Sequence, residues 1–300
     1  MSYTNVNKKY KDRLFRFLFG SKENKEYALS LYNALNGTGY TNADELQFTT
    51  IEDVVYMGMK NDVSFMIQDY MPLYEHQSSF NPNMPLRGLM YFGRLYDRYI
   101  EKNHFNRYGK ALIKIPTPQY IVFYNGLEEH GEKEILRLSD AFQTKDKSGG
   151  FEWTAIMLNI NYGRNGDLME ACKPLKEYAI FVERVRESIN RLGKEQGIRQ
   201  AIDDCIRDDI LREVLSKSKA EVIGMTLTEY DEQEQMQLFK NEGREEGREE
   251  GWEKGLKALV ESLKSFLPDF DSLYDVIIKN EDYKNVTKEQ VRKYYDYSHK

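Results

Sequence analysis

Two short apolar runs, residues 61–67 and 71–75, constrain the fold of this chain more than any other feature. They are rich in Val, Ile, Phe, Leu and Tyr, and a short polar turn separates them, which predicts two antiparallel strands joined as a hairpin. Because successive side chains of a strand point to opposite faces, Glu75 and Gln77 are expected to project together, whereas His76 points the other way. We therefore expect His76 to pack against a helix.

Pairing of these two runs would bring Asp62 beside Glu75. Two carboxylates and the neutral amide oxygen of Gln77 would then share one face of the hairpin. Such a hard, oxygen-rich set is what Mg²⁺ prefers. The sequence therefore predicts a divalent-metal site on this hairpin, and the alternative is a pair of carboxylates exposed to water at a sheet edge.

The first half of the chain shows the elements of an α/β fold. Residues 119–124 form a continuous apolar run, which predicts a strand buried on both faces. Apolar stripes at helical spacing and β-branched or aromatic runs alternate around it. These patterns predict a mixed central sheet flanked by helices. The expected helices are 10–20, 26–35 and a long one from residue 86, and the other expected strands are 48–57 and 151–162.

The character of the chain changes after residue 167. Residues 168–192, 196–217 and 220–239 all predict charged helices with apolar stripes. The expected organisation is an α/β domain over residues 1–167, a helical annex over 168–240, and a tail with C-terminal helices over 241–300.

Glycine recurs every fourth residue in the tail, at Gly243, Gly247, Gly251 and Gly255. Each glycine inside a helix costs about 1 kcal/mol relative to alanine, so the regular spacing needs a reason. One reason is the close approach of a second helix, which would make the chain a homodimer through this tail. The alternative is a charged helical linker.

Charge is distributed unevenly along the chain. The net charge is −6, but residues 1–120 hold 15 basic and 12 acidic residues, against 28 and 37 in residues 121–300. The basic excess lies in the half that holds the metal-site candidates, which suits a phosphate-rich partner. A solvated surface with chance asymmetry is the alternative.

The chain is expected to be cytoplasmic and without a membrane partner. Its N-terminus is polar, no apolar run approaches the length of a membrane span, and Cys172 and Cys205 show neither disulfide nor zinc spacing.

Several ordered motifs resemble the bacterial family of recombination-promoting nucleases and transposases within the PD-(D/E)XK nuclease superfamily. The resemblance covers roughly residues 8–255. It rests on Glu75-His76-Gln77-Ser78-Ser79 with Asn83-Met84-Pro85 and Arg87, on Asp62 in its strand, on Val122-Phe123-Tyr124-Asn125-Gly126, on Leu136-Arg137-Leu138-Ser139-Asp140, on Leu158-Asn159-Ile160-Asn161-Tyr162-Gly163-Arg164-Asn165, and on the Glu-Gly tail.

The resemblance implies a restriction-endonuclease-like sheet and a metal-dependent site. Asp62 and Glu75 would hold Mg²⁺ or Mn²⁺, and Gln77 stands where the superfamily usually has lysine. Gln77 cannot act as a base, although its amide can hold a water. The proline that usually precedes the first acidic residue is replaced here by Asn61.

Three further residues are candidates for the same site. Asp12 is implied because the first helix of the superfamily often supplies an extra acidic residue, and Glu52 lies on the expected strand before Asp62. Arg87 opens the helix after the site strand, where a phosphate contact and helix-end packing are both open readings.

The implied function is a Mg²⁺-dependent DNA endonuclease that serves recombination or mobile-element movement. The alternative is a catalytically weak nucleic-acid-binding or assembly protein that keeps the nuclease fold. Loss of the usual lysine and the acidic second half of the chain favour this alternative.

Overall fold

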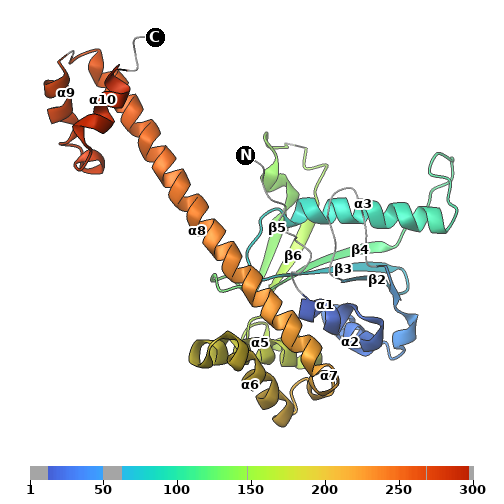
Figure 1. The fold of residues 1–300 in the computed structure, drawn as a ribbon. Helices are drawn as coiled ribbons and strands as arrows, with labels where there is room; N and C mark the ends of the chain where they lie inside the picture. Colours follow the sequence, from blue (N-terminus) through green and yellow to red (C-terminus); the bar gives the residue numbers. More distant parts are fainter. Residues whose placement is uncertain (1–12, 50–62, 147, 268, 297–300) are drawn as a thin grey trace. The chain divides into compact units, whose positions relative to one another are not determined.

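A computed structural model describes residues 13–49, 63–146, 148–267 and 269–296 (Figure 1). The chain divides into two compact units, Met1–Gln233 and Glu234–Lys300. Three of the candidate site residues, Asp12, Glu52 and Asp62, lie outside the described residues.

In its described residues the first unit is built on a mixed six-stranded sheet, which confirms the expected α/β class. Its strand order is β1-β2-β3-β4-β6-β5; β3, β4 and β6 are parallel, and the other neighbours are antiparallel. The strands are β1 (Gln47–Phe48), β2 (Val63–Met66), β3 (Tyr70–Gln77), β4 (Thr117–Tyr124), β5 (Lys133–Arg137) and β6 (Thr154–Asn159).

The predicted hairpin is present as β2 and β3. Val63 pairs with Tyr74 in antiparallel register, and Gln68 takes the left-handed conformation in the connecting turn. Of the strand expected over residues 48–57, the structure describes β1 and Thr49, and the remainder lies outside the described residues.

Strand β4 lies at the centre of the sheet between β3 and β6. Its residues from Tyr120 to Tyr124 are all buried, as predicted from the continuous apolar run. Strand β5 was not predicted, because it is an edge strand with a polar sequence whose Ile135 is half exposed.

Helices cover both faces of the sheet (Figure 1). One face packs against α1 and α2, with α5 joining the same core through Tyr178 and Phe181. The other face packs against α3, whose Tyr91, Phe92 and Leu95 contact the sheet. These helices are α1 (Arg13–Gly20), α2 (Lys25–Asn36), α3 (Met84–Lys102) and α5 (Lys173–Leu192).

The helical annex shares its core with the sheet. Apolar residues of α5 and of the helices after it belong to the same buried cluster as the α1 side of the sheet. Gly197 lets α6 approach the backbone of α5 at Ser188 and Ile189. The remaining helices of the annex are α4 (Gly166–Ala171), α6 (Lys194–Arg207) and α7 (Arg212–Lys217), followed by α8 (Lys219–Lys264).

The second unit has a small core of its own. The C-terminal part of α8 packs there with α9 (Phe270–Ile277) and α10 (Lys288–Asp296). Gly255 of the repeat belongs to this core, because a Cβ atom there would meet the hydroxyl of Tyr283. A Cβ atom at Gly243, Gly247 or Gly251 would meet no neighbour within 4 Å.

The two cysteines, Cys172 and Cys205, are buried free thiols. In the described part of the chain, every helix falls short of the length and apolarity that a membrane crossing needs.

Candidate functional site

Glu75 is a buried carboxylate on the central part of the sheet. Its side chain is 1% exposed, and Val122 of β4 is its strand neighbour. Arg87, in the first turns of α3, reaches back over β3 and places Nη2 3.0 Å from Oε2 of Glu75. The same Nη2 donates to the hydroxyl of Tyr91 at 3.1 Å. Glu75 and Arg87 therefore form an ion pair between the sheet and α3.

The surroundings of Arg87 keep its guanidinium charged. Burial by itself lowers the pKa of Arg87, but the Glu75 carboxylate and Tyr91 outweigh burial and raise this pKa above its ordinary value. A fixed positive charge therefore lies beside a carboxylate that has almost no contact with water. Of the two open readings for Arg87, the structure shows packing at the helix start with a carboxylate as its partner.

Gln77 ends β3 two residues after Glu75. The side-chain Nε2 of Gln77 donates to the backbone carbonyl of His76 at 2.8 Å. The backbone carbonyl of Gln77 accepts from the backbone N–H of Asn125. The side chain is half-buried. With its amide nitrogen engaged, the amide oxygen of Gln77 is the atom suited to accept a hydrogen bond or to bind a cation.

His76 lies on the opposite face of the sheet, as predicted. Its ring stacks on Phe15 of α1 with centroids 5.1 Å apart, and Nε2 lies 3.0 Å from the hydroxyl of Tyr178 on α5. The residue is fully buried. His76 therefore joins β3 to two helices, which is a structural role.

Of the predicted site residues, the structure brings together Glu75 and Arg87 and places Gln77 on the same strand. Asp62, Asp12 and Glu52 lie outside the described residues. Asp62 directly precedes Val63, which pairs with Tyr74, the residue before Glu75. Within the described ranges, no three His, Cys, Asp or Glu side chains form a group that could hold a metal.

The described residues nevertheless supply donors of the right chemistry for a hard cation. A carboxylate at Glu75 and an amide oxygen at Gln77 are ligands that Mg²⁺ and Mn²⁺ accept. One carboxylate oxygen of Glu75 is bonded to Arg87, so these two residues alone give an incomplete set.

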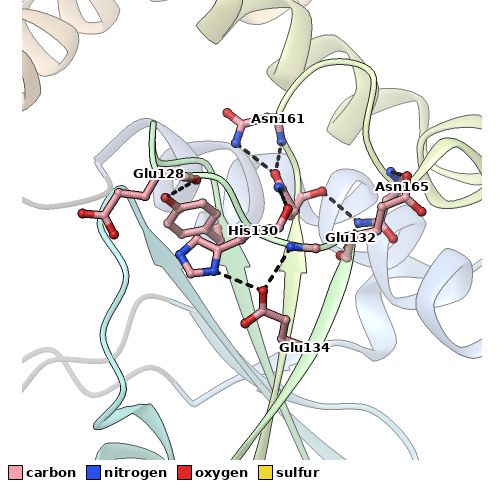
Figure 2. Close-up of polar contacts among 9 residues, drawn as sticks. Glu128, His130, Glu132, Glu134, Asn161 and Asn165 are labelled. Atoms are coloured by element: carbon pink, nitrogen blue, oxygen red, sulfur yellow. Dashed lines mark hydrogen bonds and ion pairs between the residues drawn. The ribbon is translucent and has the colours of Figure 1, made fainter.

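The sequence reading missed a polar cluster at the ends of β4 and β6 (Figure 2). Nδ1 of His130 lies 3.1 Å from Oε1 of Glu134, which also accepts from the backbone N–H of Gly131. The His130 ring stacks on Phe80 and meets Tyr124 edge-on. Because Tyr124 pairs with Gln77, this histidine lies close to the end of the site strand.

Three asparagines fix the loop that carries His130. Asn159 donates to the carbonyl of His130, Asn165 donates to the carbonyl of Glu132, and Asn161 donates to the carbonyl of Gly126 (Figure 2 labels Asn161 and Asn165). The spacing of asparagines from the last residue of β6 onward is the signal that could have indicated this cluster. Its partners come from another loop, however, and only the fold identifies them.

No protein-family model, curated protein or solved structure matches this chain in the comparisons made with it.

Proposed function

We propose that this chain is a Mg²⁺-dependent DNA endonuclease with a restriction-endonuclease-like fold. The observation that supports the proposal most is the buried carboxylate of Glu75 on the hairpin strand, paired with Arg87. Such a pair adds little to stability, because removing the carboxylate charge from water costs several kcal/mol. Carboxylates held in this way are typical of functional sites.

In this proposal Asp62 and Glu75 hold the metal, and Gln77 positions the attacking water. The bound cation supplies charge stabilisation at the phosphate and lowers the pKa of a water. The amide oxygen of Gln77 accepts a hydrogen bond from the water and orients it toward phosphorus. Water replaces the leaving alkoxide, which departs with a proton, so the products are an alcohol and a phosphate monoester.

Arg87 has a second role in the proposal. Its guanidinium can exchange one oxygen of Glu75 for an oxygen of the substrate phosphate, since carboxylate and phosphate oxygens are both anionic acceptors that a guanidinium binds. This exchange would free the carboxylate of Glu75 for the cation at the moment the DNA arrives. Asp12 and Glu52 stay candidates for a further acidic contact.

Two observations favour a second function, a nucleic-acid-binding or assembly protein with little catalysis. Arg87 holds one oxygen of Glu75, and Gln77 lacks the charge of the usual lysine. If Arg87 never leaves Glu75, the carboxylate binds the cation poorly.

Nicking of supercoiled plasmid separates the two functions. The full-length protein and its Asp62→Ala variant are purified side by side and assayed with Mg²⁺ and with EDTA. The endonuclease proposal expects nicking by the wild type with Mg²⁺ alone and loss of at least a hundredfold in the variant. Equal nicking by both proteins would show a contaminant and leave the binding function standing.

A further inference from the structure

The connection between α3 and β4, residues 103–116, combines exposed apolar side chains with basic ones. Tyr108 is 91% exposed and Leu112 is 83% exposed, and Phe105 and Ile115 are also exposed. From residue 102 to residue 127 the chain has four basic residues and no acidic one, although the whole chain has a net charge of −6. The four basic residues are Lys102, Arg107, Lys110 and Lys114.

The base of this loop is fixed, and its tip is open. Arg107 pairs with Asp97 of α3 at 2.9 Å, and the hydroxyl of Tyr96 donates to the carbonyl of Pro116. Among the described residues, no hydrogen bond or ion pair joins the side chain of Lys110 or Lys114 to a neighbour. The tip therefore presents two free ammonium groups together with exposed aromatic and aliphatic side chains.

Helix α3 continues this basic character toward Glu75. Arg87, Arg94, Arg98 and Lys102 are spaced by seven and four residues, so they lie along one side of the helix. One terminal nitrogen of Arg94 is buried without a hydrogen-bond partner in the described part of the chain. The acidic residues on α3 are Asp97, which Arg107 neutralises, and Glu101.

We propose that residues 103–116, together with the exposed side of α3, form a surface that binds the backbone of a nucleic acid. Charge complementarity selects the partner, because a phosphate backbone matches a surface on which basic residues outnumber acidic ones. Exposed tyrosine next to lysine also suits a base or sugar that stacks on the ring. The choice of nucleic acid over an acidic protein or a lipid rests on the proposed function.

The length of α3 fits this assignment. Its 19 residues extend about 28 Å at about 1.5 Å per residue. Arg87, which touches Glu75, lies at one end of the helix and the loop at the other. A duplex that rises about 3.4 Å per base pair would span this length in about eight base pairs, so one DNA segment can reach both.

Fluorescence anisotropy with a labelled 30-base-pair duplex tests the assignment. The full-length protein is compared with a Lys110→Gln/Lys114→Gln variant in EDTA over a range of salt concentrations. Lys279→Gln/Lys284→Gln, in the second unit, is the control with the same change of charge. We expect the loop variant to bind about tenfold or more weakly at 0.1 M salt, with a salt slope lower by about 2, and the control to bind like the wild type.

A second variant examines stacking without a change of charge. Tyr108→Ala is expected to weaken binding of a labelled single strand about tenfold, because each stacked base contributes on that scale. Tyr108 is exposed and has no packing role, so its removal leaves the fold unchanged, which circular dichroism verifies.

Two results would overturn the assignment. One is a loop variant that binds DNA with the wild-type affinity and salt slope. The other is a wild-type protein that does not bind DNA but binds vesicles containing phosphatidylserine through this loop. Plasmid nicking is scored separately: loop-dependent DNA binding without Asp62-dependent nicking would reject the endonuclease and support this surface.

Discussion

Glu75 and Arg87 are the residues on which the site depends. The carboxylate is 1% exposed, so nearly all of its hydration is replaced by contacts with protein groups, and the guanidinium of Arg87 is one of them. Replacing such a pair with apolar residues is often neutral, whereas removing one partner leaves a buried charge. This asymmetry allows the role of the pair in stability to be separated from its role in catalysis.

Arg87→Met should lower the free energy of unfolding by about 3–5 kcal/mol, because Glu75 stays buried after losing the charge of Arg87. The double variant Glu75→Met/Arg87→Met should recover most of this loss, and both variants should be inactive. Urea unfolding at pH 7 measures the stability of the wild type and of both variants. A double variant that is less stable than Arg87→Met would show that the two side chains are not coupled.

For single residues, the sequence predicts the face of the sheet on which a side chain lies, but not the residue that it contacts. The opposite orientations of Glu75 and His76 follow from strand alternation. The contact of Arg87 with Glu75 depends on α3 folding back over β3, which local periodicity does not encode. His130 was missed for the same reason, because its ring packs against Phe80 from another loop.

Among the elements, α3 carries both Arg87 and the basic stripe, and it packs closely against the sheet. A Cβ atom at Gly88 would meet the ring of Tyr120 on β4, so a glycine there lets the helix approach the sheet. Gly93, one and a half turns later, faces open space.

These two glycines give a matched pair of variants. Gly88→Ala should destabilise the protein by about 1–3 kcal/mol through overpacking and should reduce nicking, because it displaces Arg87. Gly93→Ala should be neutral or stabilising by up to about 1 kcal/mol, since alanine is the better helix former. Thermal unfolding compares the stability of the two variants. Equal effects of both substitutions on stability would argue against close packing of α3 on the sheet.

Elements with a strong local pattern were predicted, and elements shaped by context were not. The β2–β3 hairpin and β4 follow from apolar runs that are buried in the sheet. Strand β5 lies at an edge and exposes Ile135, so its polar sequence has no recognisable strand signature. The helix expected over residues 168–192 is interrupted at Cys172, where α4 ends and α5 begins with Pro174 near its N-terminus.

On the scale of the whole molecule, the dimer that we expect depends on the glycine repeat of the tail. Three of the repeat glycines, Gly243, Gly247 and Gly251, have open space where a Cβ atom would lie. At Gly255 the hydroxyl of Tyr283 fills that space within the second unit. A contact with a second chain through the repeat would therefore use the first three.

We expect the full-length protein to be a homodimer and a chain ending at Gln233 to be a monomer that keeps its fold. The first unit has its own core, so the truncation leaves the sheet and its site intact. Light scattering gives both masses. The same subunit number for the two chains would make the repeat a linker.

The measurement that tests the central claim most directly is Mg²⁺-dependent plasmid nicking by Glu75→Gln. Glutamine keeps the shape of the side chain but removes the anionic ligand, so nicking should fall at least a hundredfold. Glu221→Gln makes the same chemical change at an exposed position of α8 and should retain full activity. Near wild-type nicking by Glu75→Gln would contradict the proposed role of this carboxylate.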